Sequence, residues 1–146
     1  SVGRLDLNSE GLLLLTNDGD LSRYLELPKT GWSRKYRVRI FGKIQERHLD
    51  ELRKGISLKG INYSPMGITL DSQGKTNSWL TVILKGGKNR EIRETFGSFG
   101  LRVNRLIRVA YGPLNLGRLG KDEIVEVDSD ILQKQILKEW ILSRIA

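Results

Sequence analysis

Asp6 is the residue of this chain whose surroundings best suit carboxylate chemistry. It follows Arg4, precedes a polar turn, and stands just before four leucines at residues 12–15, which predict a buried strand or a short buried segment. A carboxylate beside such a segment is held rigidly with little water, and the neighbouring cation keeps it ionised by lowering its pKa. Those conditions suit a carboxylate nucleophile. The alternative is a structural ion pair between Arg4 and Asp6, and this stretch alone does not decide between the two.

The basic residues gather in two blocks of the chain. The net charge is +8; residues 34–59 hold 9 basic against 3 acidic residues, and residues 85–108 hold 7 against 2. This clustering predicts one surface that binds a polyanion, most simply nucleic acid, with a generic solvated surface as the alternative. Arg90 and Arg93 are three residues apart in the first turn of a predicted helix, where the helix dipole disfavours cations. This suggests an anionic partner, although two side chains that reach solvent explain the pattern equally well.

Composition narrows the class of protein. A chain of 146 residues suits one domain, and no apolar run approaches the roughly 20 residues that span a bilayer, so no membrane association is expected. The absence of cysteine excludes disulfides, thiol nucleophiles and zinc–thiolate sites, and fits the cytoplasm. The single histidine, His48, lies in a charged amphipathic segment, which argues against a catalytic triad or a histidine metal site. Acid–base chemistry must therefore rest on carboxylates, tyrosine, lysine or water.

Apolar periodicity predicts a mixture of strands and helices. Alternating apolar side chains and β-branched runs predict strands at residues 35–43, 66–70, 78–85, 101–111 and 124–127. Apolar spacings of three and four predict helices at residues 20–27, 45–54, 89–99 and 130–145. Asp20 and Asn89 are the expected N-caps of the first and third helices. The irregular order of these elements favours an α+β fold, with a largely antiparallel mixed sheet flanked by helices.

These segments together resemble the catalytic domain of bacterial ribosomal RNA pseudouridine synthases, in the branch that modifies single uridines. The resemblance rests on VGRLDLNSEGLLLLTNDGDL, then KYRV, then GKNREIRETF and LIRVAYGPLNLG, and it covers nearly the whole chain. It implies the pseudouridine synthase fold and the isomerisation of a specific uridine in ribosomal RNA of the large subunit. A small-subunit or transfer RNA target remains an alternative, as does a non-catalytic RNA-binding domain in ribosome assembly.

The resemblance also implies roles for individual residues. Asp6 matches the essential aspartate, Tyr36 the ring that stacks on the target base, and Arg93 the arginine that pairs with the aspartate. It implies no metal or cofactor and a ribosomal RNA partner, and we expect a monomer. Family members generally carry an N-terminal RNA-binding domain and a first strand, so we expect residues 1–146 to be an N-terminally truncated catalytic domain. The candidate RNA-binding residues are Arg4, Lys35, Arg37, Arg39, Lys88, Asn89, Arg90, Arg105 and Arg108.

Two departures from the family pattern concern the contact with RNA. Gly86 and Gly87 stand where members of this branch usually have an acidic residue before the GKN segment. Glu94 stands where basic residues usually follow the arginine. A carboxylate at this position repels phosphate, so we expect weaker local binding of RNA and unchanged chemistry.

Overall fold

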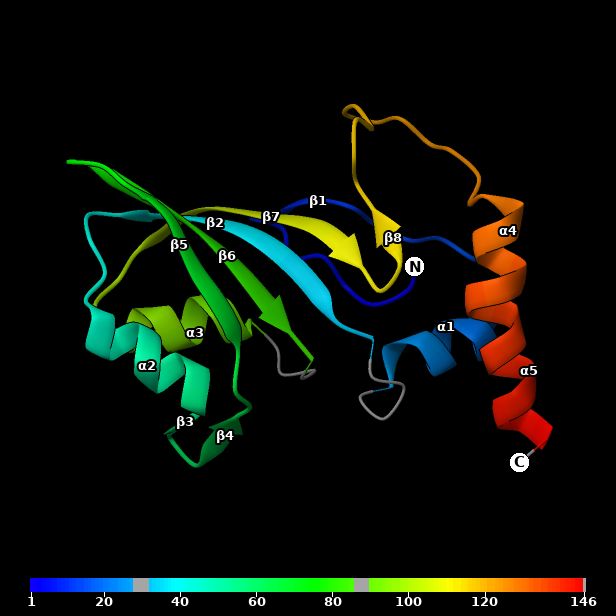
Figure 1. Ribbon diagram of the computed structural model, residues 1–146, viewed down its shortest axis with the longest axis horizontal. Helices are drawn as coiled ribbons and strands as arrows, with labels where there is room; N and C mark the ends of the chain where they lie inside the picture. Colours follow the sequence, from blue (N-terminus) through cyan, green and yellow to red (C-terminus); the bar gives the residue numbers. More distant parts are fainter. Residues whose placement is uncertain (28–31, 86–89, 146) are drawn as a thin grey trace.

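The computed structural model describes residues 1–27, 32–85 and 90–145, and its centre is a twisted six-stranded sheet (Figure 1). The strand order is β1-β7-β2-β6-β5, and β8 pairs with β7. β1 runs parallel to β7 and every other pairing is antiparallel, so the predicted α+β class is confirmed. The strands are β1 (Glu10–Gly11), β2 (Arg34–Phe41), β5 (Gly67–Gln73), β6 (Asn77–Leu84), β7 (Val103–Tyr111) and β8 (Leu114–Asn115).

One face of the sheet carries the larger hydrophobic core. Val38 and Ile40 of β2 are fully buried there, as are Leu80 and Val82 of β6, because alternate side chains of a strand share a face. Helices α2 (Glu46–Lys54) and α3 (Glu91–Ser98) lie against this face in Figure 1 and add Leu49, Leu52, Ile92 and Phe96 to the core. A small hairpin of β3 (Ile56–Leu58) and β4 (Ile61–Tyr63) lies beside α2.

A second core lies at the other end of the sheet. It packs Val2, Leu12 and Tyr111 against helix α1 (Gly19–Glu26) and the C-terminal helix (Figure 1). The C-terminal helix consists of α4 (Ser129–Ile131), a π-helical segment η2 (Leu132–Leu137) and α5 (Lys138–Ile145). No helix among the described residues is both long enough and apolar enough to cross a membrane.

Most of the predicted elements are present with small shifts at their ends. The strands predicted at residues 35–43, 66–70, 78–85 and 101–111 are β2, β5, β6 and β7, and the helices predicted at residues 45–54 and 130–145 are also found. The helix predicted at residues 20–27 begins one residue earlier, at Gly19. Its N-cap is Asp18 and not Asp20, because the Asp18 side chain accepts hydrogen bonds from the amides of Asp20 and Leu21. The sequence patterns do not predict the short strands β1, β3, β4 and β8.

Two other predictions are wrong. The strand predicted at residues 124–127 has no regular structure, and Ile124 is 83% exposed. The four leucines are not a buried segment, since only Leu12 is buried while Leu13 and Leu15 are 44% and 65% exposed. Pairing with β7 occurs just before them, at Gly11, whose φ is +109° and where an added Cβ would lie 2.2 Å from the Arg108 carbonyl oxygen. Only glycine permits that close approach.

Candidate active site

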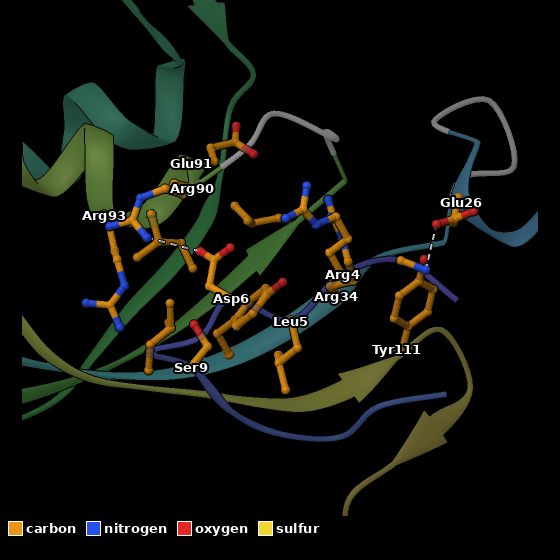
Figure 2. Close-up of a pocket in the computed structure, with 15 residues that line it drawn as sticks. Arg4, Leu5, Asp6, Ser9, Glu26, Arg34, Arg90, Glu91, Arg93 and Tyr111 are labelled. Carbon is orange, nitrogen blue, oxygen red and sulfur yellow. Dashed lines mark hydrogen bonds and ion pairs between the residues drawn. The ribbon is translucent and has the colours of Figure 1, made fainter. Parts of the chain in front are cut away.

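A cavity of about 360 Å³ lies between the two cores. Figure 2 shows Asp6, Arg90, Arg93 and Glu91 at one end of it, and Arg4, Arg34, Glu26 and Tyr111 at the other. A cavity of this size is within the range that holds a small organic ligand. Its lining residues come from the N-terminal segment, α1, β2, β6, α3 and β7: Gly3, Arg4, Leu5, Asp6, Ser9, Glu26, Arg34, Tyr36, Leu84, Arg90, Glu91, Ile92, Arg93, Leu106 and Tyr111.

Asp6 lies on a tight turn that leads into β1. The amide of Ser9 donates a 2.9 Å hydrogen bond to the Asp6 carbonyl oxygen, which closes the turn. The Asp6 side chain is 25% exposed, and its Oδ2 lies 3.6 Å from Nη1 of Arg90, the ion pair that is dashed in Figure 2. The carboxylate is therefore accessible from the cavity, and the cation that pairs with it is Arg90, whereas the sequence context predicts Arg4.

Arg90 takes this position through an unusual backbone conformation. It is the N-cap residue of α3, with φ +53° and ψ +33°, and the helix begins at Glu91. Arg90 is thus outside the helix, whereas the sequence predicts it in the first turn. The expected cap, Asn89, lies outside the described residues, as does Lys88. A left-handed conformation is uncommon in a residue other than glycine, and such residues are frequent at functional sites.

Arg93 holds the turn of Asp6 in place. Its Nη2 donates to the Asn8 carbonyl oxygen at 2.7 Å and its Nη1 to the Val103 carbonyl oxygen at 3.1 Å. Burial lowers the pKa of the Arg93 guanidinium, the charge of Arg90 lowers it further, and Asp6 opposes both. In this structure Arg93 is bound to two backbone carbonyls and Arg90 forms the ion pair with Asp6, so the pairing of Arg93 with Asp6 stays a prediction.

Arg108 is a structural residue and not a surface cation. It is 1% exposed, and its Nε donates to the Leu12 carbonyl oxygen at 2.9 Å while Nη1 lies 3.4 Å from that of Arg4. In this structure Arg108 is therefore not accessible for the RNA contact that the resemblance implies. Its guanidinium fork ties the chain on both sides of Asp6 to β7, and Arg93 adds a third tie at Asn8.

Other predicted RNA-binding residues lie away from the cavity. Lys35, Arg37 and Arg39 alternate with Tyr36 along β2, so they project from the sheet face opposite the cavity. Arg37 pairs with Asp71 at 3.1 Å. Arg105 forms two hydrogen bonds of 3.0 and 3.1 Å with Glu10, which neutralise its charge locally. Tyr36, Arg4 and Arg90 do line the cavity, as expected of residues that would contact one nucleotide.

Sequence analysis missed several cavity residues. Arg34 lies two residues before Tyr36 and shares its face of β2, so the period of two contained the signal. Glu26 accepts a 2.6 Å hydrogen bond from the Gly3 amide and closes the far end of the cavity. Tyr111 donates to the Leu25 carbonyl oxygen at 3.3 Å, and burial is the main cause that raises its pKa. No local sequence pattern marks Glu26 or Tyr111.

The cavity thus combines four arginines, three carboxylates and two tyrosine rings. Arginines bind phosphate groups through paired donors, and a tyrosine ring provides a flat surface for a base. An α+β protein with a carboxylate, arginines and tyrosine rings in one cavity has the groups that are needed to bind and act on a nucleotide. Comparison with known proteins identifies the family.

The sequence model of the RNA pseudouridylate synthase family matches residues 1–98, so this chain belongs to that family. It is 49% identical over 137 residues to an uncharacterized RNA pseudouridine synthase of Rickettsia prowazekii, covering 94% of this chain and 58% of the relative. It is 40% identical to the ribosomal large subunit pseudouridine synthase B of Buchnera aphidicola, covering 92% of this chain and 53% of the relative. The chain therefore spans little more than half the length of these two relatives.

A solved structure supports the same family. The "Crystal structure of pseudouridylate synthase" matches with a TM-score of 0.72 and 26% sequence identity, over 79% of this chain and 49% of that chain. The predicted pseudouridine synthase fold is thereby confirmed. The family membership expected from the sequence resemblance is confirmed as well.

Proposed function

We propose that this chain catalyses the isomerisation of a uridine to pseudouridine in ribosomal RNA, with Asp6 as the essential carboxylate. The observation that carries this proposal is the position of Asp6, which lies in the cavity on a turn fixed by Arg93 and beside the charge of Arg90. A preorganised, charged carboxylate is what a covalent or proton-abstracting step requires. The family supplies the reaction type.

The reaction rearranges bonds within one nucleotide. The bond from N1 of uracil to C1′ of ribose breaks, the base turns, and a bond from C5 to C1′ forms; C5 loses its proton and N1 gains one. Asp6 can start this sequence by attacking C1′, by adding to the base, or by removing a sugar proton to give a glycal. Each route requires the Asp6 carboxylate, and Nη1 of Arg90 lies 3.6 Å from its Oδ2.

Other cavity residues supply binding and orientation. Tyr36 lines the cavity from β2, where its backbone is paired on both sides, with Val82 and with Arg108, so its ring is held at a defined place for stacking on the uracil. Arg4 and Arg34 lie at the end away from Arg90, and we assign them to the phosphates next to the target nucleotide. A base that is held by stacking while its sugar is held by phosphate contacts can turn without leaving the site.

The assignment to the large subunit is supported by relatives. Proteins named ribosomal large subunit pseudouridine synthase B from Buchnera aphidicola and Haemophilus influenzae are 40% and 41% identical to this chain. A ribosomal RNA target implies action where ribosomes are assembled, so the cytoplasm remains our prediction for its location, and a monomer remains our prediction for its oligomeric state.

The proposal is tested with Asp6→Asn in the longest natural form of the protein. The substrate is bacterial ribosomal RNA that lacks its modifications and carries tritium at C5 of uridine, because pseudouridine formation releases that label. We expect release by the wild type and a loss of at least about a thousandfold in the variant. The matched control is Asp71→Asn, a carboxylate that pairs with Arg37 on the opposite sheet face and should leave the rate unchanged.

RNA binding separates the proposal from its rival. An enzyme that loses turnover in Asp6→Asn should still bind RNA with nearly wild-type affinity, measured by filter retention. A wild-type protein that binds ribosomal RNA tightly and releases no tritium would instead support a binding domain of ribosome assembly and would refute the proposal. Mapping of the modified position by base-specific chemical labelling then identifies the uridine and the subunit.

A further inference from the structure

One face of the central sheet is left open by the helices that the structure describes. Helices α2 and α3 lie against the opposite face (Figure 1), and they bury the side chains of β2 and β6 on that side. The alternate side chains of the same strands are half-buried or exposed. We call this surface the open face; the residues that matter here are Lys35, Arg37, Arg39, Phe41, Trp79 and Arg105. A solvated face is common in antiparallel sheets, so exposure alone assigns it no function.

Trp79 of β6 lies on the open face with two arginines of β2 over its ring. Arg39 is its direct cross-strand partner, and Arg37 is the diagonal neighbour on the same face. Their guanidinium carbons lie 5.7 and 5.1 Å from the ring centroid, which is the distance of a cation–π contact. Indole rings and guanidinium groups are planar, and unstacked RNA bases bind on planes of both kinds. The cluster therefore offers planar groups on which a single base can stack.

The two arginines differ in the charge that they leave for a ligand. Arg37 is paired with Asp71, since its Nη1 lies 3.1 Å from Oδ2 of that carboxylate. Arg39 is bonded to a neutral group instead, because its Nε donates to Oδ1 of Asn104 at 2.6 Å. Arg37 therefore contributes mainly its plane, whereas Arg39 contributes a positive charge that can bind a phosphate group.

Asn104 holds Arg39 through an irregularity in β7. The pairing of β2 with β7 shifts register between Arg39 and Ile40, so Asn104 is the extra residue of a β-bulge. Its Nδ2 donates to Oδ1 of Asn77 on β6 at 2.9 Å, while its Oδ1 accepts from Arg39. β-bulges commonly redirect a side chain beside a functional site. An arginine that is fixed in advance loses less conformational freedom when it binds a ligand, which raises affinity.

Charge and planar surface together select the class of ligand. The open face holds four basic side chains, Lys35, Arg37, Arg39 and Arg105, against two carboxylates that pair with them, Asp71 and Glu10. This excess of positive charge suits a polyanion, which in an RNA-modifying family is RNA, and it repels a second copy of the same face. A base can stack on an indole ring only when it has left its own helix, so the RNA is single-stranded. Phe41, 60% exposed at the end of β2, adds another ring to the same surface.

We infer that the open face is a second RNA-binding surface, on which an unpaired base stacks on Trp79 while Arg39 binds the neighbouring phosphate. The inference rests on the proposed function for the identity of the RNA, and it goes beyond that function because the open face lies across the sheet from the cavity that holds Asp6. The ligand is a single-stranded segment of ribosomal RNA away from the target nucleotide. Attachment at two surfaces raises the effective concentration of the target uridine at the cavity, and so raises the overall affinity.

The test measures binding of an oligocytidylate of about twelve nucleotides, which is single-stranded and contains no uridine for the cavity. Filter retention compares the wild type with Trp79→Leu, Trp79→Phe and Arg39→Gln in the longest natural form of the protein. We expect Trp79→Leu to weaken binding about tenfold and Trp79→Phe to weaken it less than about threefold. Arg39→Gln should weaken binding and reduce the slope of log affinity against log salt by about 0.7.

Arg47→Gln is the matched control for Arg39→Gln. Nε of Arg47 also donates to a neutral amide oxygen, that of Gln45 at 2.7 Å, but Arg47 belongs to helix α2 on the covered side of the sheet. Its replacement should leave the affinity and the salt slope unchanged. Thermal unfolding of each variant, measured by calorimetry, shows whether Trp79→Leu is destabilised, and the Arg39 result decides in that case because Arg39 bonds at the surface.

A second readout identifies the surface directly. An oligocytidylate that carries one 5-iodocytidine loses iodine on irradiation and bonds to an aromatic ring stacked on it, and mass spectrometry of the digested protein identifies the ring. We expect the bond at Trp79. A bond only at Tyr36 or Tyr111 would place the oligonucleotide in the cavity and overturn the inference.

The outcomes separate this inference from the proposed function. Equal affinity of wild type, Trp79→Leu and Arg39→Gln for oligocytidylate would overturn the second surface and leave the proposed reaction intact. Equal weakening by Trp79→Leu and Trp79→Phe would also overturn it, since a phenyl ring can still stack on a base. Trp79-dependent binding by a protein that releases no tritium from ribosomal RNA would support the open face and refute the proposed reaction.

Discussion

Substitution of each of the two arginines near Asp6 would show which of them acts through its charge and which through hydrogen bonds to backbone carbonyls. Nη1 of Arg90 lies 3.6 Å from Oδ2 of Asp6, whereas Arg93 donates to two backbone carbonyl oxygens with two different nitrogens. A lysine can replace a point charge but cannot reproduce the planar guanidinium fork. We therefore expect Arg90→Lys to remain active and Arg93→Lys to be impaired, with Arg90→Gln impaired by loss of charge.

The size of the Arg90 effect follows from the distance. At 3.6 Å and an effective dielectric constant of about 20, Coulomb's law gives an attraction of about 5 kcal/mol. The Arg90 and Asp6 side chains are 41% and 25% exposed, so screening by water reduces the usable part to about 1–2 kcal/mol. This corresponds to a loss of about 5- to 30-fold in kcat/KM for Arg90→Gln. Arg93→Ala should instead lower the free energy of unfolding by about 2 kcal/mol, because two charge-assisted hydrogen bonds are lost.

The assay is release of tritium from C5 under single-turnover conditions, together with urea unfolding of each variant. Arg90→Gln should unfold like the wild type, while Arg93→Lys should be less stable as well as less active. Wild-type rates in Arg90→Gln would refute the role of its ion pair. An Arg93→Lys variant with full stability and full activity would refute the backbone tie and would favour the direct pairing with Asp6 that the family resemblance implies.

Three further predictions concern stability and RNA binding. Gly11→Ala should destabilise the protein by about 3 kcal/mol or more in urea unfolding, since its Cβ would lie 2.2 Å from a backbone oxygen, whereas Gly42→Ala, with φ +82° and open space, should cost about 1 kcal/mol. Burial raises the folded-state pKa of Tyr111 above its ordinary value of 10.0, so the stability that its neutral hydroxyl contributes is fully present below pH 10.0 and is lost as the pH rises through the folded-state pKa. In unfolding measured at increasing pH, Tyr111→Phe should therefore lose less stability above pH 10.0 than the wild type. Arg34→Gln should reduce the slope of log affinity against log salt by about 1 unit, and Arg105→Gln by less, because Glu10 already neutralises Arg105.

Local patterns in the sequence were sufficient for the elements that form the larger core. Strand β2 follows the alternation of Val38 and Ile40, and helix α2 follows the spacing of Leu49 and Leu52, because burial of one face determines each pattern. The four leucines misled the prediction, since their apolar character implied burial. The strand of this region that pairs with β7 is β1, just before the leucines, and it approaches β7 closely at Gly11. This contact joins distant segments of the chain, so no local pattern contains it.

Several members of the candidate site were predicted from the sequence, but their contacts were not. Asp6, Tyr36 and Arg93 do line one cavity, which agrees with the resemblance. The exchange of roles between Arg90 and Arg93 depends on the left-handed backbone of Arg90 at φ +53°, and sequence patterns favour helix there. The burial of Arg108 could have been foreseen. It shares one face of β7 with Leu106 and Ala110, two residues before and after it, and both of these are buried.

These contacts reduce the number of basic residues that are available to bind RNA. In the block of residues 85–108, Arg93 and Arg108 bind backbone carbonyls and Arg105 binds Glu10, so three of its basic residues are committed within the protein. An arginine fork that satisfies carbonyls fixes a loop with a geometry that lysine cannot match. Among the described residues, Arg4 and Arg34 line the cavity without such ties, and Arg90 pairs with Asp6. Electrostatic contact with RNA should therefore be concentrated around the one nucleotide in the cavity, and the charge count of the whole chain overstates the number of phosphates that this part of the protein can neutralise.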